Sequence, residues 1–283
     1  MIRQVLRSTS KLSYVAGPRV APVAARWVRP SGAVIGLAAL ATTGWIVGSS
    51  LKDFEFAPTR LLSVLELEAP PPSNVKIDSS TSLPFPLSIL PKSLQSASPS
   101  SAPLALVGLG VRTVSFLRVK VYAAGFYAPK GTWWEKPGMG SEASMKEFLE
   151  SDQPCVLRIV PTRNTGFDHL RDGFVRAIQA RVKLLSKASQ MSESEAEAIE
   201  SALTPFKAMF PKRSAAKGEE LLLIRLSSGE LVVEFEGEIL GKVQEKAIGK
   251  LLMIGYFLDD GKEISPVLKN SVLQGFQQGG QVA

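Results

Sequence analysis

Short hydrophobic segments, some alternating and some continuous, predict a β-sheet in the part of this chain that follows residue 100. The most informative is residues 104–129, LALVGLGVRTVSFLRVKVYAAGFYAP, which is rich in Val, Leu, Phe and Tyr. It predicts two strands with a break near residues 115–118. Further strands are expected at 155–160, 221–226 and 231–235, with a hairpin turn at 227–230 joining the last two.

Helical periodicity occurs between and after these strands and is clearest over residues 165–187. Apolar residues recur there at three- and four-residue steps, which predicts an amphipathic helix: Phe167, Leu170, Phe174, Ile178, Val182 and Leu185. More helices are expected at 143–151, 193–210 and 244–257, and from Ser265 and Pro266 onward. Strands, helices, a hairpin and further helices in this order predict an α+β fold.

The second strand of the 104–129 stretch has two different faces. Successive side chains of a strand point to opposite sides, so Lys120 and Tyr122 are expected to share one face, beside small residues. Val119 and Val121 are expected on the other face, against a core. Arg112, in the preceding strand, lies among glycines and aliphatic residues, where an unpaired guanidinium is costly to bury. It therefore needs a carboxylate, a carbonyl or an anionic ligand.

The first hundred residues are organised differently. Residues 1–30 are basic and contain no acid, which is typical of a mitochondrial presequence, with a disordered basic tail as the alternative. Residues 31–51 carry no charge and are long enough for a transmembrane helix in the inner membrane, a buried soluble helix being the alternative. The positive flank then predicts a single-pass protein with its C-terminal domain in the intermembrane space. Residues 52–100 are rich in Pro and Ser and are interpreted as a linker, in which 83–90 could form an edge strand.

Charge and residue counts exclude several classes of function. Residues 1–52 hold seven cations and no acid, while the remaining 26 Lys and Arg balance the 26 Asp and Glu. The net charge of +7 therefore belongs to the N-terminus and does not indicate a nucleic-acid groove. One cysteine, Cys155, and one histidine, His169, exclude an internal disulfide and a multi-His metal centre. Cys155 is expected to be a small core residue.

Two blocks of the sequence resemble the chalcone isomerase family. The first is Gly110-Val111-Arg112 followed by residues 120–127, KVYAAGFY; the second is residues 256–260, YFLDD, with 264–269, ISPVLK. The resemblance covers roughly residues 101–279 and is nearest to the mitochondrial chalcone isomerase-like proteins of fungi, the altered-inheritance-of-mitochondria proteins. It implies an open-faced sandwich, a curved antiparallel sheet with helices on one face and a ligand cleft between them.

The resemblance also implies a ligand site. The family arginine, which stabilises developing negative charge in the enzymes, corresponds to Arg112, and a family threonine corresponds to Tyr122. The catalytic Tyr and Asn of the enzymes have no counterpart in residues 165–173. Non-catalytic members clamp a fatty-acid carboxylate with an Arg and a Tyr. We therefore expect a binder of a fatty acid or a similar apolar anion through Arg112 and Tyr122, with Lys120 adding positive potential.

Alternatives to this binder remain open at this point. One is an intramolecular lyase of the chalcone–flavanone isomerase type, and another is a fold without a ligand that serves as an interaction platform. His169, the sole histidine, could also be an axial haem ligand, although its place on the polar side of a helix favours an exposed residue. No other cofactor and no metal site are expected.

Overall fold

The computed structural model describes residues 74–114, 117–131, 140–258 and 263–278. All of them belong to one compact unit, Leu67–Ala283. The expected presequence at 1–30 and transmembrane helix at 31–51 lie outside the described residues. Among the helices that are described, none combines the length and the apolar character needed to cross a membrane.

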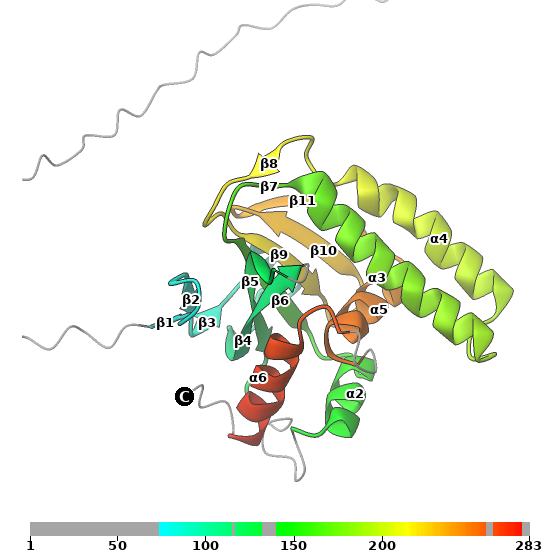
Figure 1. Cartoon of the computed structure of the whole chain (residues 1–283). Coiled ribbons are helices and arrows are strands. Elements are labelled where there is room, and N and C mark those ends of the chain that lie inside the picture. The colour runs from blue at the N-terminus through cyan, green and yellow to red at the C-terminus, as the bar shows by residue number, and fades with distance from the viewer. Residues whose placement is uncertain (1–73, 115–116, 132–139, 259–262, 279–283) are drawn as a thin grey trace, which may run out of the picture. The chain divides into compact units, whose positions relative to one another are not determined.

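A seven-stranded antiparallel sheet forms the centre of the described structure (Figure 1). In chain order its strands are β3 (Ser88–Ile89), β4 (Leu104–Val114), β5 (Val119–Ala128), β6 (Cys155–Pro161), β9 (Leu221–Arg225), β10 (Leu231–Phe235) and β11 (Glu238–Val243). Their order across the sheet is β11-β10-β9-β6-β5-β4-β3, so nearly every strand lies beside its nearest neighbour in the sequence. The two strands expected within 104–129 are confirmed as β4 and β5.

Five helices pack on one face of this sheet or on one another (Figure 1). They are α2 (Glu142–Glu150), α3 (Phe167–Lys187), α4 (Glu193–Ala208), α5 (Lys246–Phe257) and α6 (Pro266–Gln277). The apolar residues predicted for the 165–187 helix lie in or against the main core between sheet and helices. Ser265 caps α6 and Pro266 begins it, as expected. The α+β prediction is therefore confirmed.

Helix α6 approaches β4 unusually closely because glycines line the contact. A Cβ atom placed on Gly108 would lie 2.6 Å from the backbone nitrogen of Val272, and one on Gly110 would collide with the backbone of Leu268. Gly275 of α6 meets the backbone of Val107 in the same way. The two glycines that precede Arg112 thus allow a helix to lie directly on the strand that carries this residue.

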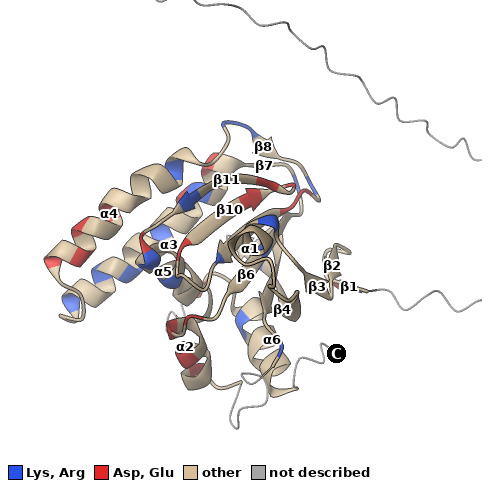
Figure 2. Cartoon of the chain, turned by 180° about the vertical axis from the view of Figure 1, so that it is seen from behind, with Lys and Arg blue, Asp and Glu red and all other residues tan. Residues whose placement is uncertain are grey.

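The segment 74–100 is part of the fold, which corrects the linker boundary expected from the sequence. It contributes β1 (Val75–Ile77), β2 (Pro84–Pro86), β3 and α1 (Lys92–Ala97), and β3 supplies the edge strand expected within 83–90. Phe85 and Leu94 are buried in a second core with residues from the other face of the sheet. Helix α1 lies over that face in the view from behind (Figure 2). Helices are consequently not confined to one face.

Buried charged groups hold this N-terminal segment in place. Arg158 of β6 donates to the backbone oxygen of Pro84 at 2.9 Å, pairs with Glu220 and lies with its Cζ 4.8 Å from the centre of the Phe85 ring. Glu234 of β10 accepts a hydrogen bond from the backbone of Ser93 at 2.6 Å, at the start of α1.

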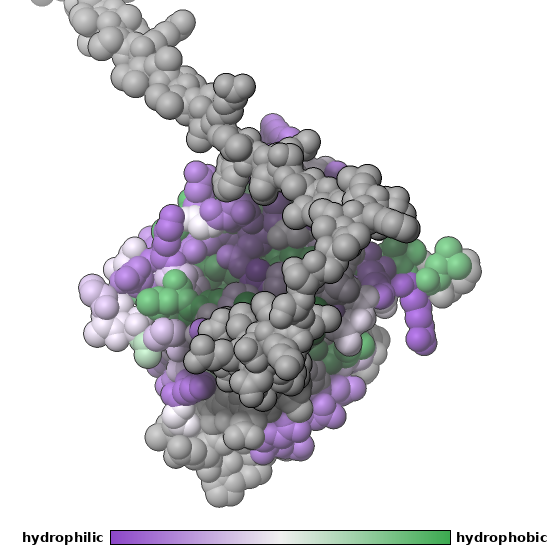
Figure 3. Space-filling model, turned by 90° about the vertical axis from the view of Figure 1, so that its left-hand side faces the viewer, coloured by the Kyte–Doolittle hydropathy of each residue, from purple (hydrophilic) through white to green (hydrophobic). Residues whose placement is uncertain are grey.

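The surface in Figure 3 is coloured by hydropathy. On the part of this face that the grey atoms do not hide, hydrophobic residues occur in small patches separated by hydrophilic ones.

Candidate functional site

Strand register places Arg112 beside Tyr122. These residues are direct partners across β4 and β5, whereas the next pair is Thr113 with Lys120. Val121 is therefore the extra residue of a β-bulge, and it packs against the same core as Tyr122. Because a bulge interrupts the alternation of side chains, Lys120 does not share a face with Tyr122.

Arg112 is half-buried between β5 and α3. Its Nη1 donates a hydrogen bond to the Tyr122 hydroxyl at 3.3 Å, and its Cζ lies 5.8 Å from the centre of the Tyr122 ring. Burial alone would lower the pKa of Arg112, but its interactions with Tyr122 outweigh burial, so that the pKa is raised. Within the described parts of the chain, no Asp or Glu forms an ion pair with this guanidinium.

Tyr122 continues into a second buried phenol. Its hydroxyl lies 2.6 Å from that of Tyr256 on α5, and both side chains are fully enclosed. Burial raises the pKa of both phenols, although the Arg112 guanidinium opposes the increase. The result is a chain of three hydrogen-bonding groups, from the guanidinium at the edge of the core to a phenol inside it.

A pocket of about 310 Å³ opens beside Arg112 and Tyr122. Part of its wall is apolar and comes from Val114, Val121 and Leu170. The rest is polar and basic, and it comes from the segment 163–165 and from α3: Arg163, Thr165, His169 and Arg176. An apolar wall beside several cationic groups suits an amphiphilic anion.

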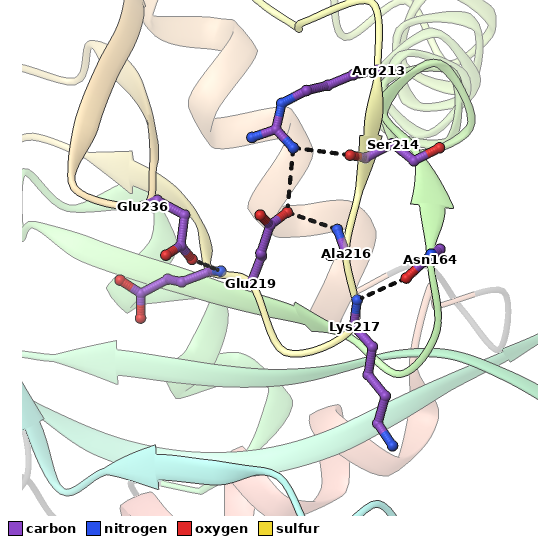
Figure 4. A network of polar contacts seen from close by, with 8 residues as sticks. Asn164, Arg213, Ser214, Ala216, Lys217, Glu219 and Glu236 are labelled. Carbon is purple, nitrogen blue, oxygen red and sulfur yellow. Dashed lines mark hydrogen bonds and ion pairs between the residues drawn. The ribbon is translucent and has the colours of Figure 1, made fainter. Parts of the chain in front are cut away.

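A network of polar contacts fixes the segment that carries Arg163 (Figure 4). Asn164 accepts a hydrogen bond from the backbone of Lys217 at 3.2 Å, while Glu219 accepts from the backbone of Ala216 at 2.6 Å and pairs with Arg213 at 3.4 Å. The short strands β7 (Thr165–Gly166) and β8 (Ser214–Ala215) pair alongside. This rim of the pocket is thus held by main-chain contacts as well as by packing.

The space deeper between sheet and helices is filled by aromatic side chains. Phe126 of β5 lies 4.8 Å from Phe257 of α5 and 6.1 Å from Phe148 of α2, measured between ring centres. Phe148 lies 5.7 Å from Phe276 of α6. The cleft that the resemblance implied between sheet and helices therefore has side chains in its interior, and the pocket lies at the end where Arg112 is.

The structure brings together some of the predicted site residues and separates others. Arg112 and Tyr122 meet as expected. Lys120 does not join them: it is exposed and donates to the backbone oxygen of Ser80, which corrects its expected place in the site. His169 is exposed on α3, as the simpler interpretation held, yet it lines the same pocket as Arg112. Cys155 is buried, as expected.

Sequence reasoning missed Tyr256, Arg163 and Arg176 as residues of this site. Tyr256 had a signal, because it is the one residue with a hydroxyl in α5, a helix that is hydrophobic on nearly all sides. Arg176 lies outside the apolar positions that define the 165–187 helix, and Arg163 lies in a loop without periodicity. Their convergence depends on the packing of α3 against the sheet.

Comparison with known proteins agrees with this architecture. A family model described as "Chalcone isomerase like" matches residues 102–137 and 135–273. The chain belongs to the chalcone isomerase-like family. The sequence-based assignment to this family, and to its fungal mitochondrial members, is thereby confirmed.

Fungal relatives of the family cover most of the chain. Altered inheritance of mitochondria protein 18, mitochondrial, of Kluyveromyces lactis is 28% identical over 91% of this chain and 88% of its own length. The protein of the same name from Debaryomyces hansenii is 28% identical over 73% of this chain and 76% of its own length.

A solved structure shows the same fold. It is a fatty-acid binding protein of Arabidopsis thaliana, with a TM-score of 0.57 and 18% identity, covering 73% of this chain and 98% of the plant chain. At this identity the likeness concerns the fold, a curled antiparallel sheet with packed helices.

Proposed function

We propose that this chain is a non-catalytic binder of a fatty acid or a similar apolar anion, held at the Arg112 pocket. One observation carries the proposal: Arg112 has no acidic partner among the described residues and is joined to the buried Tyr122 at the wall of a partly apolar pocket. A guanidinium–carboxylate hydrogen bond is charge-assisted and roughly twice as strong as a neutral one. The fold shared with a fatty-acid binding protein supports this proposal.

The size of the pocket favours acids of medium chain length. A volume of about 310 Å³ lies at the small end of the range of ligand pockets. Each buried methylene adds about 0.8 kcal/mol, so two should raise the affinity roughly tenfold while room remains. In a series of saturated acids of increasing length, we expect the affinity to rise steeply and then level off once the pocket is full.

The proposal is tested in two steps with the purified full-length protein. Denaturing extraction and mass spectrometry should reveal a co-purified acid. Titration with dodecanoate should then give saturable binding that Arg112→Gln weakens about tenfold or more, because a hydrogen bond to a charged group is worth about 1.5–3 kcal/mol. Lys120→Gln is the matched control, since it removes one charge on the other side of the bulge. Equal losses in both variants, or none in either, would reject the Arg112 site.

Binding without turnover is part of the proposal. The tyrosine and asparagine that chalcone isomerases carry at the start of the long helix have no counterpart in residues 165–173. Losing one such donor can reduce a rate by about 100-fold or more. We expect no enone-to-flavanone conversion above the buffer rate, and a conversion that Arg112→Gln abolishes would establish the isomerase alternative instead.

An interaction platform is the second candidate, and the filled interior favours it. With Phe126, Phe257 and Phe148 packed in the main core, the fold needs no ligand to complete that core. The platform predicts neither co-purified acid nor saturable binding of dodecanoate.

We also propose a mitochondrial, membrane-anchored location. Residues 1–30 would act as the presequence and 31–51 as a single inner-membrane span, with the C-terminal domain in the intermembrane space. The mitochondrial names of the fungal relatives support the compartment. Extraction of mitochondrial membranes with alkaline carbonate should leave the protein in the pellet, and its release into the supernatant would refute the anchor.

A further inference from the structure

The pocket beside Arg112 carries more positive charge than one carboxylate needs. Arg163 and Arg176 line it together with Arg112, and His169 lies at the same opening. None of its lining residues is acidic. After residue 52 the chain is balanced, with 26 cations and 26 acids, so a pocket whose charged lining residues are all basic is a local feature.

These additional arginines are available to a ligand. Both side chains are exposed, and in the described structure neither forms an ion pair or donates a side-chain hydrogen bond. Like charges gathered around one pocket without an acid repel each other, and the repulsion is stronger beside a low-dielectric core than in open water. An anion bound between them would relieve this repulsion.

The local structure places these groups around one pocket. His169, Gly173 and Arg176 follow one another on α3 at steps of four and three residues, which places them along one side of the helix. Arg112 reaches α3 at Gly173, where a Cβ atom would lie at an ordinary contact distance of 3.5 Å from Arg112 Nη1. Arg163 approaches from the loop held by the network of Figure 4. The cations thus come from a strand, a helix and a loop.

We propose that this pocket takes a phosphate-headed amphiphile, an apolar chain that ends in a phosphate monoester. This inference rests on the proposed function, binding of an apolar anion at Arg112, and specifies its head group. A phosphate monoester carries about −1.5 to −2 charges at pH 7 and three strong acceptor oxygens, whereas a carboxylate carries one charge and two oxygens. Arg112 contacts one side of the phosphate, Arg163 and Arg176 neutralise its second charge, and the chain lies against Val114, Val121 and Leu170.

The test compares two ligands with the same chain, dodecyl phosphate and dodecanoate, on the full-length protein at pH 7.5 and below their micelle concentrations. We expect dodecyl phosphate to bind about tenfold more tightly or better. Arg163→Gln and Arg176→Gln should each weaken dodecyl phosphate about tenfold while changing dodecanoate less than about twofold. Lys183→Gln is the control, because it removes an exposed cation of the same helix that does not line the pocket.

Three outcomes would contradict either the phosphate inference or the proposed function. Equal affinity for the two ligands, or an affinity ratio that neither arginine variant changes, overturns the phosphate inference and leaves acid binding intact. Displacement of dodecyl phosphate by inorganic phosphate at equal concentration shows a site for phosphate without a chain and also overturns it. Failure of both dodecyl ligands to bind overturns the proposed function itself.

Discussion

The hydroxyl of Tyr122 lies 2.6 Å from the hydroxyl of Tyr256 and also accepts a hydrogen bond from Arg112. The two tyrosines, one on a strand and one on a helix, are 134 residues apart in the sequence, and both are fully buried. Their pairing satisfies two polar groups inside an apolar core and orients the Tyr122 oxygen that receives the guanidinium. The position of Arg112 at the pocket therefore depends on the interior of the fold.

Removal of the Tyr256 hydroxyl should destabilise the folded state, although Tyr256 does not line the pocket. Tyr256→Phe leaves the buried Tyr122 hydroxyl without one of its two partners, which should lower the free energy of unfolding by about 1–3 kcal/mol. Tyr122→Phe should cost a similar amount. The double variant should cost less than the sum, because each single change already breaks the shared hydrogen bond. Urea denaturation of the four proteins measures this coupling, and strictly additive losses would show that the two hydroxyls do not interact.

Alkaline pH should destabilise the protein through its buried tyrosines. Burial raises the pKa values of Tyr122, Tyr127 and Tyr256 above that of an exposed phenol, near 10. Above pH 10 the unfolded state therefore loses protons that the folded state keeps, and stability falls as the pH rises. The slope should be about 1.4 kcal/mol per pH unit for each such tyrosine.

Tyrosinate absorbance and far-ultraviolet circular dichroism, followed together from pH 9 to 12, test this expectation. Three of the four tyrosines of the chain are these buried ones, so most of the absorbance change should coincide with unfolding. Full ionisation near pH 10 with the helical signal unchanged would contradict the burial of the phenols.

Periodicity predicted most of the elements because the main core is built from regular patterns. The 165–187 helix and the strands on both sides of residues 115–118 followed directly from the spacing of apolar residues. The prediction that Lys120 shares a face with Tyr122 was wrong because period-two alternation assumes an uninterrupted strand. The bulge at Val121 breaks that alternation. A bulge leaves no signature in the hydrophobic pattern, since Val121 fits either face.

The packing of the segment 74–100 on the sheet was missed for a different reason. Proline and serine in residues 74–100 suggested a linker, yet a short edge strand tolerates proline, and β2 begins and ends with it. The available signal was charge: Arg158 and Glu234 interrupt otherwise apolar strands, and a buried charge requires a partner. Glu234 finds its partner in the backbone of Ser93, and Arg158, which pairs with Glu220, also donates to the backbone oxygen of Pro84.

Close packing of α6 on β4 makes Gly110 a sensitive position. Gly110→Ala would push its new Cβ into the backbone of Leu268, which cannot move as a flexible side chain could. We expect a loss of about 1–3 kcal/mol in unfolding free energy. Gly255→Ala is the control, because its Cβ would meet its nearest neighbour, the Ala177 side chain, at an ordinary 3.5 Å; it should be neutral or stabilise by up to about 1 kcal/mol. Thermal denaturation compares the two, and similar midpoints would show that α6 can shift away from β4.

The segment 74–100 should be necessary for the stability of the domain, because it packs on the sheet. Phe85 is fully buried under the Arg158 guanidinium, so Phe85→Ala should cost about 3–5 kcal/mol. Ile77→Ala changes a residue that is 55% exposed and should stay within about 0.5 kcal/mol. A chain that begins at residue 101 should expose the apolar face formed by Leu106, Val156 and Ile224 and aggregate, whereas one that begins at residue 74 should give a cooperative unfolding transition. If the two truncated chains unfold at the same urea concentration, the segment 74–100 contributes nothing to the fold, and the boundary suggested by composition is the correct one.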